Sequence, residues 1–230
     1  MASRFFTPGP LAPGEFVLTG AEAHHLATVR RFAPGDRIVL FNGDGSEYSA
    51  EIVSTERKRA VLNVLGAEAV SRELPFELTI AAAMPKGDRG DFLIEKLVEL
   101  GVTRFVPLHT ERTIVQPKES RLEKLQQAVI EASKQCGRNV LMRIDELTRW
   151  NEFVKQSRDG AKAILHPDGE PLRSLETKSR NVAFAVGPEG GFTEEEVSLA
   201  ESAGWRRVSL GPRILRVETA AIAAAAWAVQ

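Results

Sequence analysis

The chain has 230 residues, a formal net charge of −1 and 27% charged residues. This length supports one large or two modest domains with buried cores, and we expect two. A net charge close to zero excludes a uniformly basic surface for binding nucleic acid, but it is compatible with local basic patches. The single cysteine, Cys136, excludes an internal disulfide and a cysteine-rich zinc site.

The opening stretch, MASRFFTPGPLAPGEF, lacks the apolar core of a signal peptide. No apolar run elsewhere approaches the roughly 20 residues that a membrane-spanning helix needs. We therefore expect a cytoplasmic protein without a membrane segment.

Residues 1–70 mostly alternate apolar and polar side chains, as half-buried strands do. One helical stretch, residues 21–32, stops before Pro34-Gly35. The sequence NGDG at 42–45 supplies the residues that a tight hairpin favours. We predict a small antiparallel β-barrel with strands DRIVLFN (36–42), SEYSAEIVS (46–54) and RAVLNVLG (59–66).

Residues 74–230 instead alternate apolar strand-like runs with helical patterns, which predicts a parallel sheet covered by helices. The expected strands are residues 77–84, 104–110, 161–167, 181–186 and 206–211. The expected helices are residues 88–101, 118–137, 193–204 and 218–229. The fold class is therefore α/β behind a small β-barrel.

Two successive strands are each followed by a glycine-bearing turn and then a helix: GPEGGFTEEE at 187–196 and LGPRILRVETA at 210–220. Loops at the carboxyl ends of parallel strands form ligand sites. Thr193 and Glu196 form a capping box, and Glu194 and Glu195 add charge to the first helical turn. A helix start already compensated by carboxylates is a poor phosphate cradle, so we expect a neutral or cationic ligand between two walls.

These two stretches resemble the signature of the ribosomal RNA small subunit methyltransferase E family, of the SPOUT class. MPKGDRGDFLIEKLVELGVTRFVPLHTERT (84–113), EASKQCGR (131–138), HHLATVRR and the early RFF resemble the same family in the same order. The resemblance implies a PUA-like N-terminal β-barrel over 1–70 that binds RNA and a trefoil-knotted methyltransferase domain over 74–230. It also implies a homodimer, S-adenosylmethionine as methyl donor, and methylation at N3 of a uridine in 16S ribosomal RNA.

The same resemblance places the S-adenosylmethionine pocket on the two turns, with the end of an earlier strand as a third wall. The implied residues are Leu165, His166, Gly187, Pro188, Glu189, Gly190, Gly191, Leu210, Gly211, Ile214, Leu215, Arg216 and Thr219.

Methylation at uridine N3 requires loss of a proton, which leaves negative charge on the ring carbonyl oxygens. A nearby guanidinium stabilises such charge, and Arg216 is our first candidate. Glu218 and Thr219 are weaker catalytic candidates, and a loop-bracing ion pair is the alternative role for Arg216. No general base is assigned.

Basic residues gather locally: residues 112–143 hold seven Lys and Arg against three Glu, and residues 206–216 hold four Arg without an acid. Such an excess attracts phosphates, although an ordinary solvated surface has the same composition. The candidate RNA contacts are Arg4, His25, Arg30, Arg31, Lys86, Arg112, Lys134, Gln135 and Arg138.

No metal site is expected, because the adjacent His24 and His25 point about 100° apart on a helix. Cys136 falls at a helix end, where the dipole does not favour a thiolate. Seven of the 12 residues of the helix at 218–229 are alanine, which favours close packing in the core or against a partner subunit. Two other functions stay open: a SPOUT enzyme that modifies a ribose 2′-hydroxyl or guanosine, and a non-catalytic RNA-binding ribosome-assembly module.

Overall fold

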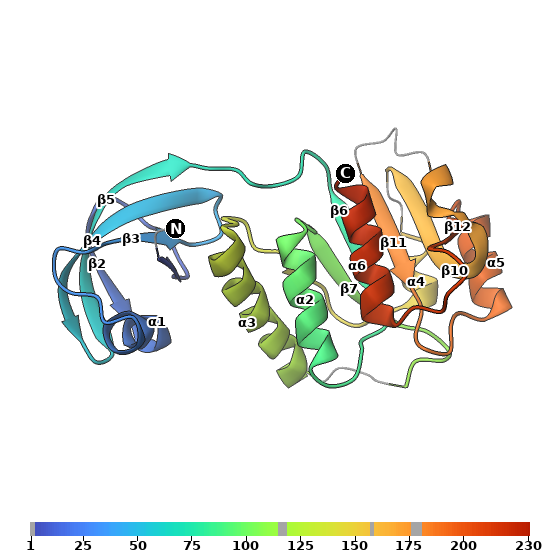
Figure 1. Cartoon of the computed structure of the whole chain (residues 1–230), viewed down its shortest axis with the longest axis horizontal. Helices are drawn as coiled ribbons and strands as arrows, with labels where there is room; N and C mark the ends of the chain where they lie inside the picture. Colours follow the sequence, from blue (N-terminus) through green and yellow to red (C-terminus); the bar gives the residue numbers. More distant parts are fainter. Residues whose placement is uncertain (1–2, 115–118, 157–158, 176–180) are drawn as a thin grey trace. The chain divides into compact units, whose positions relative to one another are not determined.

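A computed structural model describes residues 3–114, 119–156, 159–175 and 181–230 of the chain (Figure 1). The contacts divide the chain into two compact units. The first consists of Met1–Glu73 with Ser133–Leu141, and the second of Leu74–Ala132 with Met142–Gln230. The segment 133–141 thus packs with the first unit, although it lies far along the sequence. The domain limits of 1–70 and 74–230 stay a prediction.

The first unit contains a five-stranded sheet in the order β1-β3-β4-β5-β2. Its strand pairs are antiparallel except β1 with β3, which run parallel. Between β3 and β4, Gly43 and Gly45 have φ angles of 93° and 96°, which glycine adopts without strain. The strands are β1 (Arg4–Phe6), β2 (Gly14–Thr19), β3 (Arg37–Phe41), β4 (Ser46–Glu56) and β5 (Arg59–Ala69).

The alternating pattern of these strands fills one apolar core, to which Leu40, Ile52 and Leu62 contribute fully buried side chains. A short helix, α1 (Gly20–His24), and a π-helical turn, η1 (His25–Val29), cover this core with Leu26. The helix is shorter than the predicted 21–32. It ends because Arg31 adopts a left-handed φ of 56° ahead of Pro34.

The second unit contains a parallel sheet in the order β12-β10-β11-β6-β7-β8, with β9 paired to β7. The central strands β6 and β11 are buried along their whole length, which explains their unbroken apolar sequences. The very short β8 and β9 carry too few residues to show a period and were not predicted. The strands are β6 (Leu78–Ala82), β7 (Arg104–His109), β8 (Arg143–Ile144), β9 (Thr148–Arg149), β10 (Ala161–Pro171), β11 (Val182–Val186) and β12 (Arg206–Ser209).

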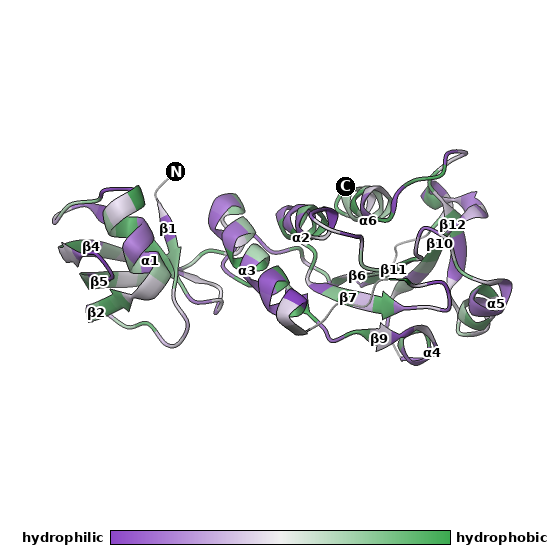
Figure 2. Cartoon of the chain, turned by 90° about the horizontal axis from the view of Figure 1, so that it is seen from below, coloured by the Kyte–Doolittle hydropathy of each residue, from purple (hydrophilic) through white to green (hydrophobic). Residues whose placement is uncertain are grey.

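Helices cover both faces of this sheet: α2 and α6 lie on one face and α4 on the other (Figure 2). The four predicted helices are confirmed to within a residue or two, and the α/β class with them. The trefoil knot stays a prediction. Within the described residues, no helix is long and apolar enough to cross a membrane. The helices are α2 (Arg89–Glu99), α3 (Glu119–Cys136), α4 (Trp150–Phe153), the 3-10 turn η2 (Leu172–Ser174), α5 (Glu194–Ser202) and α6 (Val217–Ala228).

Candidate functional site

A cavity of about 440 Å³ opens beside the middle of β10 and at the carboxyl ends of β11 and β12. Since β10 pairs with both β11 and β12, residues 165–168 of β10 lie next to the loops that follow these two strands. Ligands of open parallel sheets bind at such strand ends, and the volume falls in the range of small-molecule pockets. The structure thus brings together loops that are distant in sequence.

Eleven of the thirteen residues expected in the pocket line this cavity: Leu165, His166, Gly187, Pro188, Glu189, Gly190, Gly191, Leu210, Gly211, Ile214 and Leu215. The other two, Arg216 and Thr219, are exposed and outside the lining. Sequence reasoning missed further lining residues because their contribution depends on side-chain direction. These are Pro167, Asp168, Val186, Phe192, Glu194, Ser209, Arg213, Val217, Ala220 and, as a pocket residue, Arg112.

The turn at residues 187–191 forms one wall of the cavity. Its backbone closes through a 2.8 Å hydrogen bond from the Gly191 amide to the Pro188 carbonyl, and Gly191 has a φ of 71°. A Cβ atom on Gly187 would lie only 3.0 Å from the ring of Phe192. That ring is buried against Trp150, with a centroid distance of 4.6 Å. Packing therefore favours glycine at position 187, and the backbone conformation favours it at position 191.

The turn leads directly into α5 through the predicted capping box, which is confirmed. The Thr193 hydroxyl accepts from the Glu196 amide at 3.2 Å, and the Glu196 carboxylate accepts from the Thr193 amide at 2.9 Å. The backbone amide of Glu195 and then the Thr193 hydroxyl lower the pKa of the Glu195 carboxyl. The first helical turn is thus occupied by its own carboxylates, which disfavours a phosphate at this wall.

The second turn and residues 165–168 of β10 form the other walls. Gly211 has a φ of 110°, and its amide donates to the Ser209 hydroxyl at 3.2 Å. The Ile214 side chain is 81% exposed at the rim of the cavity. In β10 the pairing register with β12 shifts between Leu165 and Glu170, which places His166 at the cavity.

The three catalytic candidates, Arg216, Glu218 and Thr219, lie at the start of α6. Arg216 occupies the N-cap position with an exposed side chain, whereas Arg213, which the sequence analysis did not single out, lines the cavity. Glu218 is buried outside the cavity lining, and its Oε1 lies 3.6 Å from the Arg89 guanidinium. Arg89 also lies 3.8 Å from Glu189 on the first turn. Of the two arginines in the loop 213–216, Arg213 thus lines the cavity and Arg216 lies beside it.

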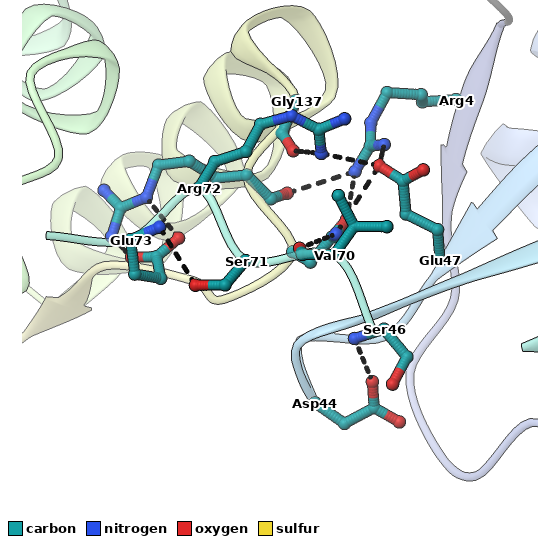
Figure 3. A network of polar contacts seen from close by, with 11 residues as sticks. Arg4, Asp44, Ser46, Glu47, Val70, Ser71, Arg72, Glu73 and Gly137 are labelled. Carbon is teal, nitrogen blue, oxygen red and sulfur yellow. Dashed lines mark hydrogen bonds and ion pairs between the residues drawn. The ribbon is translucent and has the colours of Figure 1, made fainter. Parts of the chain in front are cut away.

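Three of the candidate RNA contacts form ion pairs within the first unit, and Figure 3 shows the pair of Arg4 with Glu47. Arg4 pairs with Glu47 at 2.5 Å, Lys134 with Glu22 at 2.8 Å, and Arg138 with Glu73 at 2.5 Å; the side chains of these three cations are at most 10% exposed. Arg72 adds a second guanidinium to Glu47 and donates to the Gly137 carbonyl at 2.8 Å. The contacts of Lys134, Gly137 and Arg138 tie the segment 133–141 to the rest of the first unit, and the ion pairs favour a structural role for all three cations.

The other candidate RNA contacts are more accessible. Arg30, Arg31, Lys86, Arg112 and Gln135 are exposed, and Arg30 donates to the Ser3 hydroxyl at 2.7 Å. His25 is half-buried and packs against the ring of Phe5 with a centroid distance of 5.9 Å.

His24, His25 and Cys136 all lie outside the cavity lining. Cys136 is a half-buried free thiol at the last residue of α3. Within the described ranges, no group of three or more His, Cys, Asp and Glu side chains is arranged to hold a metal ion.

Comparisons with known proteins agree with this geometry. The model of an RNA methyltransferase domain matches residues 72–229, and that of an RNA methyltransferase PUA domain matches residues 18–65. The ribosomal RNA small subunit methyltransferase E of Synechocystis is 34% identical over 93% of this chain and 72% of its own length. The chain belongs to the ribosomal RNA small subunit methyltransferase E family.

Solved structures of similar proteins extend the match to the whole fold. The methyltransferase E of Neisseria gonorrhoeae, crystallised with S-adenosyl methionine, has a TM-score of 0.92 and 36% identity, covering 99% of this chain and 96% of its own. A Legionella pneumophila protein solved with the bound cofactor SAM has a TM-score of 0.93 and 34% identity, covering 100% and 97%. The methyltransferase E family architecture, with its PUA domain and parallel α/β domain, is thereby confirmed.

Proposed function

We propose that this chain transfers a methyl group from S-adenosylmethionine to N3 of a uridine in 16S ribosomal RNA of the small ribosomal subunit. The observation that carries the proposal is the cavity between two glycine-bearing turns, in a chain of the methyltransferase E family. A similar protein of this family was crystallised with S-adenosyl methionine.

The residues of the cavity fit such a donor. Glycine at positions 187, 190 and 191 lets a ligand approach the backbone closely, and the carboxylates of Glu189 and Glu194 at the lining suit a positive charge. When bound, S-adenosylmethionine supplies an electrophilic methyl group on a sulfonium. The enzyme then needs chiefly to align the nucleophile and exclude water.

The chain also offers a group for the charge that develops on the uracil. Deprotonation at N3 spreads negative charge onto the ring carbonyl oxygens, which a fixed guanidinium stabilises. Arg213 at the cavity lining and Arg216 at the start of α6 are the two groups on the adjoining loop. We propose Arg216 for this role, and the matched variants Arg213→Ala and Arg216→Ala test it. Turnover that falls only in Arg213→Ala would transfer the role to Arg213.

We further propose that the first unit binds the RNA through basic residues at one end of its sheet. Arg57, Lys58 and Arg59 form an exposed turn between β4 and β5. The Lys58 carbonyl accepts a 3.2 Å hydrogen bond from the Gly20 amide, which joins this turn to the start of α1. Clustered cations of this kind give salt-dependent affinity for phosphates.

A homodimer and a cytoplasmic site of action complete the proposal. One side of α6 carries Ile222, Ala223, Ala226 and Trp227, which are all partly exposed. We propose that this apolar side packs against a second copy, and sedimentation of the Ile222→Glu variant as a monomer would support it. Because the proposed substrate is ribosomal RNA, we propose that the enzyme acts in the cytoplasm, where ribosomes are found.

The decisive experiment incubates the enzyme and labelled S-adenosylmethionine with small ribosomal subunits from cells that lack the activity. Nucleoside mass spectrometry should then show 3-methyluridine in 16S ribosomal RNA. A methylated ribose or methylguanosine would assign a different target, and a protein whose melting temperature does not respond to the donor would be a binding module.

A further inference from the structure

We propose that Arg112 is a positioning residue that holds the first glycine turn in the shape that admits the methyl donor. Arg112 lies just after β7, outside both glycine-bearing turns, and the sequence analysis considered it only as an RNA contact. The inference rests on the proposed function, because it concerns the donor pocket of that reaction.

The Arg112 side chain reaches across to the turn that follows β11. Its Nη1 donates to the Gly190 carbonyl at 2.7 Å and more weakly to the Phe192 carbonyl at 3.4 Å. The aliphatic part of the side chain lies against the same turn, because a Cβ on Gly190 would be 3.4 Å from the Cβ and Cδ of Arg112. One side chain thus binds the turn through polar and apolar contacts together.

A side chain from the start of α5 also reaches back to the backbone of the segment that carries Arg112. The buried Glu196 carboxylate accepts from the Glu111 amide at 2.9 Å through one oxygen and from the Thr193 amide at 2.9 Å through the other. Thr110 and Thr113 hydrogen-bond across the bend at 2.9 Å. The backbone around Arg112 is therefore fixed, so that its guanidinium is held at the turn rather than left free to follow solvent.

This arrangement matters because the turn lacks internal support at its tip. The Gly191 amide to Pro188 carbonyl bond closes its base, and glycine residues at 190 and 191 have no side chains to pack. A flexible glycine turn must be ordered on binding, which weakens affinity. Arg112 orders it beforehand, and because Arg112 also lines the cavity, its loss acts directly on the donor site.

The test compares Arg112→Met with Arg112→Lys and with Arg207→Met as the matched control. Arg207 lies in the same unit and pairs with Glu201 at 2.9 Å, outside the cavity lining. Calorimetry with S-adenosylmethionine should show binding about tenfold weaker in Arg112→Met, the loss of one charge-assisted hydrogen bond. KM for the donor should rise by the same factor with a smaller change in kcat. Arg112→Lys should recover part of the affinity, and Arg207→Met should match the wild type.

Hydrogen exchange of the Gly191 amide gives a second measurement that needs no donor. The exchange rate should be about tenfold higher in Arg112→Met than in the wild type, and intermediate in Arg112→Lys. If the methionine variant does not fold, the exchange rate of Arg112→Lys decides the case. A wild-type protein that binds no donor would refute the proposed function, while the exchange data would still test the contact.

Unchanged donor affinity and unchanged Gly191 exchange in both variants would overturn the positioning role. The same holds if donor affinity stays constant while the salt slope of RNA binding falls by about one, since Arg112 would then contact a phosphate.

Discussion

The substitution Gly187→Ala tests whether the shape of the first turn depends on the aromatic cluster beneath it. The added methyl group would lie 3.0 Å and 3.1 Å from two ring carbons of Phe192 and 3.2 Å from its backbone nitrogen. The ring cannot easily withdraw, because it is 4% exposed and packs on Trp150. Overpacking at such a site costs about 1–3 kcal/mol. We expect a free energy of unfolding lower by about 2 kcal/mol.

The comparison with Gly191→Ala separates steric contact from backbone strain. At Gly191 a Cβ meets no atom within 4 Å, so that only its φ of 71° opposes alanine. That strain costs about 1–2 kcal/mol. Replacing Phe192 with Leu should relieve the contact in Gly187→Ala but leave the strain in Gly191→Ala unchanged.

Urea denaturation of the single and double variants measures both effects, and calorimetry with S-adenosylmethionine measures the consequence for the pocket. The double variant Gly187→Ala/Phe192→Leu should be destabilised by about 1 kcal/mol less than the sum of the two single variants. Strict additivity of Gly187→Ala and Phe192→Leu, or a fully stable Gly187→Ala, would refute the packing argument.

Three further outcomes follow from the contacts. Arg138→Met breaks its buried pair with Glu73 and should lower the free energy of unfolding by about 3 kcal/mol in urea, without changing the salt slope of RNA binding. Burial raises the pKa of the Glu47 carboxyl, but the guanidinium groups beside it outweigh burial and hold the pKa below 4.5. As the pH falls from 4.5, the Glu47 carboxyl takes up a proton in the unfolded chain before it does so in the folded protein, so the stability of the folded protein should fall. Glu47→Gln should reduce this acid sensitivity, as measured by melting at several pH values. Thr193→Ala removes the capping box and should cost about 1 kcal/mol, measured by thermal unfolding with Ser as the conservative control.

Much of the fold was predictable because its causes are local. The apolar run at 181–186 predicted a strand, which the structure has at Val182–Val186, since a strand buried on both faces needs no polar side. Thr193 and Glu196 predicted the start of α5, because a capping box acts within one helical turn. The glycine-bearing turns likewise predicted where the cavity lies.

Tertiary structure alone decided which distant groups meet. Arg138 and Glu73 are separated by 65 residues, and Arg112 and Gly190 by 78. No period or spacing encodes such a pair, because the contact exists only once strands have taken their order in the sheet. For this reason the sequence could mark Arg4, Lys134 and Arg138 as cations but could not show that carboxylates already pair with them. Composition fixes which charges are present, and the folded chain fixes which of them remain available to a ligand.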